Sequence, residues 1–187
     1  MTISENAVLI VIDVQEGFRD PSWGTRNNPA AETNIAALGE AWSASGRPIV
    51  LVRHDSVNAG SPLQPGQPGN DLIPPVAALP HELFVTKSVN SAFYGEPALE
   101  PWLRSHGATE LVIVGIQTNM CVETTARMAG NLGFAVTVPL DATHTFDLTG
   151  PTGISLTADE LATATALNLA GGGFARVVAT ADVLREI

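Results

Sequence analysis

Short apolar runs alternate along the chain with longer segments whose apolar residues recur at helical spacing. Six runs are strand candidates, and most of them are nearly continuous apolar stretches rich in Val and Ile, which is typical of strands buried on both faces. These runs cover residues 7–13, 47–53, 82–87, 109–115, 134–141 and 175–182. The alternation predicts a doubly wound, Rossmann-like α/β fold in one domain over 1–187. We expect about six parallel strands in the order 3-2-1-4-5-6, with helices on both faces.

Residues that favour helix ends separate these runs. The first helix is predicted to begin at Asn28, with Pro29 as its first residue, and to end at Gly46. Thr157 and Glu160 form a capping-box pattern at the start of the last helix. The remaining helices are predicted over residues 97–106 and 118–132.

Two segments lack any such periodicity. Residues 56–80 are rich in Pro and Gly, and residues 143–155 follow the fifth predicted strand. Long connections are uncommon inside a compact domain unless they serve as functional loops or lids. We therefore expect these two segments to shape a binding site.

Composition excludes several classes of function. The 187 residues include 45% hydrophobic and 15% charged residues, which is typical of a globular chain. Nine basic and 19 acidic residues give a net charge of -10, which opposes nucleic-acid binding. The apolar runs are too short to span a membrane, and the N-terminal sequence lacks the features of a signal peptide. With Cys121 as the single cysteine, no internal disulfide forms, and we expect a cytoplasmic protein.

Three chemically distinctive residues follow or end predicted strands. Asp13 ends the first strand, Lys87 ends the third, and Cys121 follows the fourth at the start of a helix. Lys87 is the single lysine among nine basic residues. Ligands of doubly wound folds bind beyond the carboxyl ends of the strands, where the strand order reverses. The sequence therefore predicts that a carboxylate, an amine and a thiol meet there.

This combination is typical of nucleophilic catalysis. A thiolate is the reactive form of cysteine, and a helix N-terminus together with the Lys87 ammonium would stabilise it. Asp13 would accept the thiol proton, and backbone N–H groups at the helix start would bind an oxyanion. Each residue also has a purely structural interpretation: a strand-end cap for Asp13, a solvated charge for Lys87 and a buried apolar thiol for Cys121.

At these residues the sequence resembles the isochorismatase-like cysteine hydrolases, a superfamily that includes nicotinamidase and N-carbamoylsarcosine amidohydrolase. The resemblance covers nearly the whole chain and rests on segments 8–18, 86–95 and 114–143. It implies a six-stranded parallel sheet and a catalytic Asp, Lys and Cys, which match Asp13, Lys87 and Cys121.

The same resemblance implies further features of the site. A cis peptide bond would fall at Ile116–Gln117, which would turn the Gln117 N–H toward the oxyanion beside that of Cys121. True isochorismatases lack the cysteine and cleave an enol ether, so Cys121 indicates hydrolysis of a C–N bond.

The resemblance also bears on metal binding. Nicotinamidases carry an Asp and two His as metal ligands shortly after the second strand. Here His54 and Asp55 are adjacent, with no second histidine near them. We therefore expect no metal and no other cofactor, and we interpret His54 as a residue that supports the site or holds a loop.

Candidate substrate contacts lie at strand ends and in the two long connections. Each of these residues is equally consistent with local packing. They are Gln15, Phe18, Trp23, Tyr94, Ile116, His144 and Phe146.

The sequence thus predicts an amidohydrolase that cleaves a small carboxamide or ureide through a thioester. One alternative is a redox-sensing or scaffold protein, although the chain has no second cysteine that could form a disulfide with an oxidised Cys121. Another is a non-amide hydrolase of the isochorismatase type. A nucleotide-binding oxidoreductase is disfavoured because no GxGxxG follows the first strand. The alanine-rich segment 160–170 favours a homo-oligomer, either a dimer or a tetramer.

Overall fold

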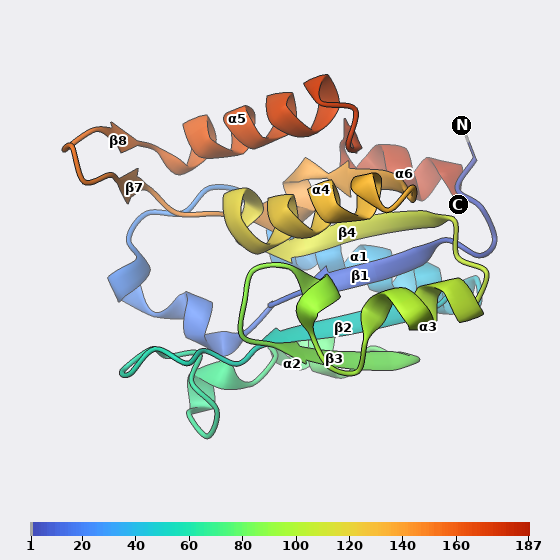
Figure 1. Ribbon diagram of the computed structural model, residues 1–187, viewed down its shortest axis with the longest axis horizontal. Coiled ribbons are helices and arrows are strands. Elements are labelled where there is room, and N and C mark those ends of the chain that lie inside the picture. The colour runs from blue at the N-terminus through green and yellow to red at the C-terminus, as the bar shows by residue number, and fades with distance from the viewer. Residues whose placement is uncertain (1) are drawn as a thin grey trace.

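The computed structural model describes residues 2–187, which form a central parallel sheet with helices on both faces (Figure 1). The path through the main sheet is β3-β2-β1-β4-β5-β9, and a short strand, β6, pairs with β4 beside that path. This is the predicted order, with β9 as the sixth strand, so the predicted fold class is confirmed. The strands are β1 (Val8–Ile12), β2 (Ile49–His54), β3 (Leu83–Lys87), β4 (Glu110–Ile116), β5 (Ala135–Pro139), β6 (Thr143–His144) and β9 (Arg176–Val178).

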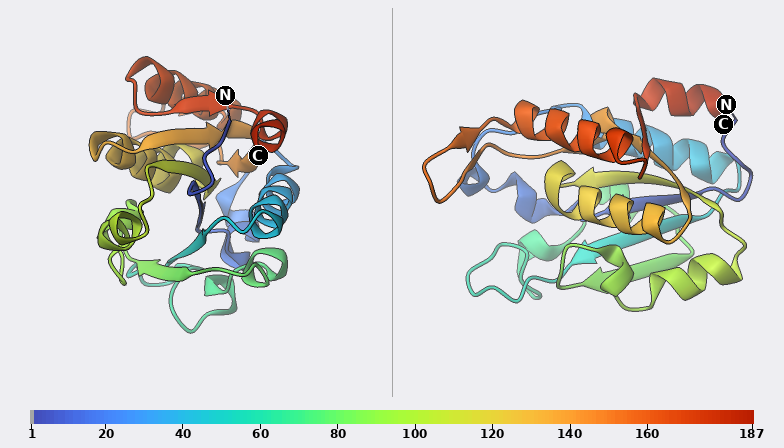
Figure 2. Two further views of the ribbon diagram at one scale, coloured as in Figure 1. Left: turned by 90° about the vertical axis from the view of Figure 1, so that its right-hand side faces the viewer. Right: turned by 45° about the horizontal axis from the view of Figure 1, so that its top comes forward.

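Helices pack on the two faces of this sheet in separate layers, as the end-on view in Figure 2 shows. Helices α1, α2 and α6 bury their apolar side chains against one face, and α3, α4 and α5 bury theirs against the other. Their bounds are α1 (Ala31–Ala44), α2 (Pro74–Ala77), α3 (Leu99–Ser105), α4 (Glu123–Asn131), α5 (Ala158–Gly171) and α6 (Thr180–Glu186). Short turns are η1 (Glu16–Arg19), η2 (Pro21–Trp23), η3 (Pro68–Asn70), η4 (Ala92–Tyr94), η5 (Thr118–Val122) and η6 (Leu140–Ala142).

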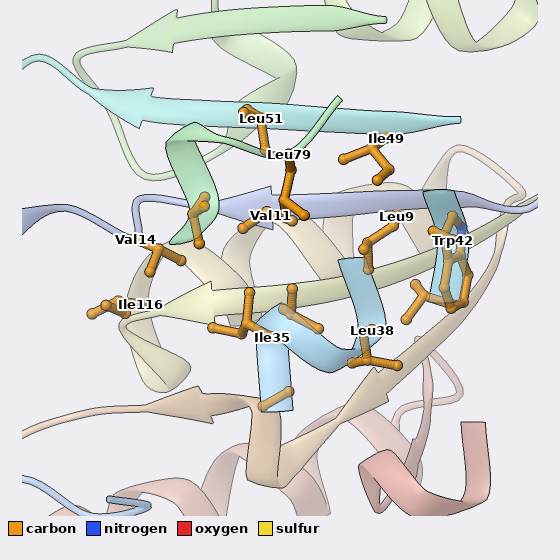
Figure 3. Packing of buried hydrophobic residues seen from close by; sticks show 14 of the residues in the cluster. Leu9, Val11, Val14, Ile35, Leu38, Trp42, Ile49, Leu51, Leu79 and Ile116 are labelled. Atoms are coloured by element: carbon orange, nitrogen blue, oxygen red, sulfur yellow. The ribbon is translucent and has the colours of Figure 1, made fainter. Parts of the chain in front are cut away.

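Side chains of β1 alternate between the two apolar layers. Leu9 and Val11 pack into the layer with Trp42 of α1, which Figure 3 shows from close by. Val8 and Ile10 belong to the opposite layer. Because both faces are buried, the strand has no polar face, and this explains its continuous apolar run. Trp42 also donates its indole N–H to the Ala7 carbonyl, 3.0 Å away.

The start of the first helix differs from the prediction. Helix α1 begins at Ala31, with Ala30 as its N-cap, and Asn28 lies outside it with φ +45°. The Asn28 amide instead donates to the carbonyls of Leu140 and Thr143, at 3.0 and 2.7 Å. The predicted N-cap at Asn28 is therefore wrong, because bonds to a distant segment fix the side chain that local sequence assigned to capping.

The C-terminal part of the fold differs in two further ways. The sixth strand covers only Arg176–Val178, and the chain then forms α6 from Thr180, where a strand was expected to continue to 182. Residues 143–155, predicted as an aperiodic loop, contain β6 and one arm of a hairpin. This hairpin, β7 (Leu148–Thr149) and β8 (Ser155–Leu156), projects beyond the sheet in Figures 1 and 2. By contrast, the Thr157 and Glu160 capping box is confirmed.

A helix that crosses a lipid bilayer needs about 20 mostly apolar residues. Across residues 2–187, no helix combines the length and the apolar character that crossing a membrane requires.

Candidate active site

Three strand ends bring Asp13, Lys87 and Cys121 together. Asp13 directly follows β1, Lys87 is the last residue of β3, and Cys121 lies in η5 just after β4. Strands β1 and β4 are neighbours, although the chain reaches β4 only after β2 and β3, so the strand order reverses there. The cluster thus lies at the position that the fold predicts for a ligand site.

Lys87 makes contacts with the other two residues. Its Nζ lies 2.6 Å from Asp13 Oδ2 and 3.4 Å from Cys121 Sγ. Strand β2 lies between β1 and β3, so Lys87 must reach across about 10 Å of sheet to meet Asp13. A long, flexible amine suits this task better than the planar guanidinium of the other basic residues.

Asp13 is held where its carboxylate has no access to solvent. Its backbone lies in the left-handed region at φ +53°, which turns the chain sharply after β1. Burial raises the pKa of Asp13, and the Lys87 ammonium opposes that rise. The other carboxylate oxygen, Oδ1, is buried without a hydrogen-bond partner among residues 2–187. An unpaired acceptor on a carboxylate of raised basicity is suited to accept a proton.

The Cys121 thiol is buried beside two charged groups, Asp13 and Lys87. Burial raises the pKa of its thiol, and the negative charge of Asp13 raises it further, while Lys87 acts in the opposite direction. Desolvation thus opposes ionisation of the thiol, and the ammonium favours it. The prediction that Asp13 accepts the thiol proton during attack stays a prediction.

His54 completes the surroundings of the ammonium. Its Nδ1 lies 3.2 Å from Lys87 Nζ, and burial, followed by the Lys87 charge, lowers its pKa, so the ring accepts as a neutral group. Backbone groups of His54 are fixed by Gln15, whose amide accepts from the N–H and donates to the carbonyl, at 2.9 and 3.0 Å.

Donor atoms of Asp13, His54 and Cys121 lie within 4.8 Å of one another, a spacing that raises the question of a metal ion. However, the Lys87 ammonium is already in direct contact with all three side chains. An ion bound by them would contact a positive charge. Asp55 is paired with Arg53 at 2.8 Å. These residues do not fit a metal site.

The turn that carries Cys121 depends on close backbone approach. Gly115 has φ +126°, and a Cβ there would lie 2.0 Å from the Ile12 carbonyl oxygen. The Ile116–Gln117 peptide bond is cis, as the resemblance implied. The Gln117 carbonyl then accepts the N–H groups of Met120 and Val122, at 3.1 and 3.2 Å.

A cavity of about 350 Å³ opens beside Cys121. Three of the residues that line it are aromatic, and their rings pack on one another. The ring centroids of Phe18 and Trp23 are 5.1 Å apart, and those of Trp23 and Phe146 are 5.5 Å apart. The other apolar lining residues are Leu63, Met120 and Leu148. The polar lining residues are Ser22, His54, Asn90, Gln117, Asn119, Cys121 and Asp147.

Four of the predicted substrate contacts do not line this cavity. Gln15 is buried against His54, and Tyr94 is 72% exposed on η4. Ile116 is buried in the core. His144 lies behind the wall, with its ring edge-on to Phe146 at 5.3 Å. Phe18, Trp23 and Phe146 do line the cavity, and their contact with a substrate stays a prediction.

Sequence reasoning missed several lining residues. Asn90 follows Lys87 by three positions, and its Oδ1 lies 3.9 Å from the Cys121 sulfur. Asn119, two positions before the nucleophile, accepts a short hydrogen bond from the Thr145 hydroxyl. Their closeness in sequence to two chemically distinctive residues would have identified both. Leu63, in the segment over 56–80, offered no such indication.

The doubly wound sheet thus carries a buried acid, an amine and a thiol in contact at its switch point. The isochorismatase domain model matches residues 7–181, and the chain belongs to the isochorismatase family.

Individual relatives agree with this assignment. The isochorismatase family protein YrdC of Bacillus subtilis is 39% identical over 78% of this chain and 78% of its own length. Nicotinamidase 3 of Arabidopsis thaliana is 33% identical over 97% of this chain and 77% of its own. A crystal structure of an isochorismatase-family protein from Chromobacterium violaceum superposes with a TM-score of 0.92, at 44% identity, over 100% of this chain and 96% of that one.

Proposed function

We propose that the protein hydrolyses a C–N bond of a small carboxamide or ureide, with Cys121 as nucleophile. The observation that carries this proposal is the contact of one ammonium with both a carboxylate and a thiol, beside an open cavity. Similarity to a nicotinamidase supports amide chemistry. The substrate is taken to be a small molecule because the cavity is of the size that encloses one.

In the first half of the reaction, Cys121 Sγ attacks the amide carbonyl carbon while Asp13 takes the thiol proton through Oδ1. The carbonyl oxygen gains the negative charge, which the backbone N–H groups of Gln117 and Cys121 would stabilise. When this intermediate collapses, the C–N bond breaks and Asp13 returns the proton to the departing nitrogen. An acyl thioester and a free amine or ammonia result.

In the second half, Asp13 takes a proton from water as the water oxygen attacks the thioester carbonyl. The C–S bond then breaks, and the proton passes to the sulfur, which restores the neutral thiol. Carboxylic acid is the second product. One carboxylate therefore serves both halves as base and acid, which a raised pKa favours because the group then binds and releases a proton nearer neutral pH.

Lys87 determines which oxygen of Asp13 accepts the proton. Its ammonium is bonded to Asp13 Oδ2, which leaves Oδ1 as the oxygen that receives the proton. The same ammonium lies 3.4 Å from the sulfur and stabilises negative charge there as the proton leaves.

The test compares wild type with Cys121→Ala and Cys121→Ser on a panel of primary amides and ureides, read out by ammonia release. We expect hydrolysis by the wild type and loss of at least about a thousandfold in kcat in both variants. An acyl adduct on the single cysteine, Cys121, should appear in the intact mass of the wild type and be absent from Cys121→Ala. Hydrolysis that persists in Cys121→Ala, with circular dichroism unchanged, would refute the proposal.

A further inference from the structure

The charge carried by the residues that line the cavity is negative. Among the lining residues within 2–187, Asp147 is the one acidic side chain, and no lysine or arginine is present. His54 is held neutral by burial, which lowers its pKa. Lys87 lies beneath the floor, fully buried and bonded to Asp13.

The arginines that neighbour cavity residues in sequence are also occupied. Each forms an ion pair with a carboxylate on its own segment or on the adjoining helix. These pairs are Arg19 with Glu16 at 3.0 Å, Arg26 with Glu32 at 2.6 Å, and Arg53 with Asp55 at 2.8 Å. Each guanidinium is therefore already neutralised by a carboxylate.

From this distribution of charge we propose that the cavity accepts amides whose remaining part is flat and either uncharged or positively charged, and that it discriminates against substrates bearing a carboxylate. The inference rests on the proposed function and names its substrate class. A bound carboxylate would lose water without gaining a cationic partner, and it would meet the like charge of Asp147. The net charge of -10 would also slow its approach.

The same wall favours a cation. Asp147 Oδ1 accepts the N–H of Ala158 at 2.7 Å, so the carboxylate is fixed at the start of α5. Trp23 and Phe146 line the same cavity, and aromatic rings attract a cation through their quadrupoles. A flat apolar ring would be held against the stacked aromatic side chains, and a positive substituent would lie near Asp147.

Benzamide and two para-substituted derivatives of nearly equal size, the 4-carboxy and the 4-aminomethyl compound, test this inference. Hydrolysis is followed by ammonia release, and binding is measured separately by calorimetry with the Cys121→Ala variant. We expect kcat/KM and affinity for the carboxylate to be at least about tenfold below those for benzamide. The amine should equal or exceed benzamide in both measurements.

A matched pair of variants separates the local charge from the charge of the whole protein. Asp147→Asn keeps an oxygen for the Ala158 N–H and removes one negative charge, whereas Glu40→Gln removes the same charge from an exposed site on α1. Asp147→Asn should reduce the preference for amine over carboxylate several-fold, and Glu40→Gln should leave it unchanged. Equal effects of the two variants would overturn the role of Asp147.

The two measurements distinguish failure of the inference from failure of the proposed function. If the carboxylate is bound or hydrolysed as well as benzamide, or if none of the three binds, the inference is overturned. If the binding order holds but none is hydrolysed by the wild type, the charge preference stands and amide hydrolysis of this class is refuted.

Discussion

The ammonium of Lys87 and the carboxylate of Asp13 form an ion pair of 2.6 Å in which neither side chain is exposed to solvent. Burying two charges costs several kcal/mol per ion, and their attraction offsets this cost only while both partners are present. Each partner therefore depends on the other, and removal of one leaves an uncompensated charge in the interior.

Replacing Lys87 by Met keeps the length of the stem and removes the charge. We expect a loss of about 3–5 kcal/mol in the free energy of unfolding at pH 7, because the Asp13 carboxylate stays buried without its partner. Urea denaturation measures this loss. Arg19→Met, which breaks an exposed pair with Glu16, should cost less than about 1 kcal/mol. Equal losses in the two variants would contradict the interpretation.

The pH dependence of hydrolysis should report on Asp13. Burial raises the pKa of this group above its ordinary value of 3.8, so it retains its proton to higher pH than an exposed aspartate. Activity requires the ionised form, and the acid limb of kcat/KM should therefore lie above pH 3.8. In Lys87→Met the opposing ammonium is absent, and the limb should move further toward alkaline pH. A limb that stays in place or moves toward acid in this variant would exclude Asp13 as the titrating base.

Much of the fold follows from local sequence. The apolar runs at 7–13 and 109–115 are buried on both faces over 7–13 and 111–115, and such strands have few alternatives to the centre of a parallel sheet. Asp13 and Lys87 were predictable because strand ends in this topology converge. The hairpin of β7 and β8 was not, since a pair of two-residue strands leaves no detectable periodicity.

Features fixed by distant contacts account for the remaining differences. Asn28 has the local character of an N-cap, and bonds to residues more than a hundred positions away decide its conformation. The burial that raises the pKa of the Cys121 thiol is produced by the assembled fold, which sequence spacing does not report. Placement of His144 outside the cavity has the same origin, because its ring packs behind Phe146.

Gly115 allows β4 to approach β1 at the site. In Gly115→Ala the new Cβ would lie 2.0 Å from the Ile12 carbonyl oxygen, a backbone atom that cannot move freely. We expect a loss of more than about 3 kcal/mol in unfolding free energy, or failure to fold. Gly133→Ala also introduces Cβ at a positive φ, +86°, but into open space, and should cost about 1–2 kcal/mol. Thermal or chemical unfolding measures both losses. Similar losses of unfolding free energy in the two variants would show that the close approach of Gly115 to Ile12 is unimportant.

His144 should make stability depend on pH. Burial, together with the Arg26 charge, lowers its pKa to about 3, whereas the unfolded chain titrates near 6.5. Between these values the unfolded state binds the proton, so stability falls as the pH is lowered below 6.5. This residue alone should account for a loss of about 2 kcal/mol between pH 7 and pH 5. His144→Leu should remove that part of the slope, and the exposed His81→Gln should retain it. Parallel slopes for wild type and His144→Leu would contradict this assignment.

Oligomeric state is a separate prediction. The alanine-rich helix α5 exposes Leu167 at 70%, and the hairpin exposes Ile154 at 68%. We expect a homo-oligomer, which light scattering at several concentrations detects as a mass of at least twice that of one chain. Ile154→Ser should weaken the assembly if the hairpin contributes to it. A monomeric mass for the wild type at all concentrations would refute the prediction.

The origin of each lining residue has a practical consequence. Asp13, Lys87 and Cys121 come from the ends of strands or the turn beside them, whereas Phe146 and Asp147 directly precede the hairpin and Leu148 begins it. Under the proposed function, one part of the cavity wall thus lies in a different stretch of polypeptide from the residues proposed to cleave the bond. A chimera that receives residues 145–156 from a relative should retain the reaction and acquire a new selectivity, which makes this stretch the natural target for redesign.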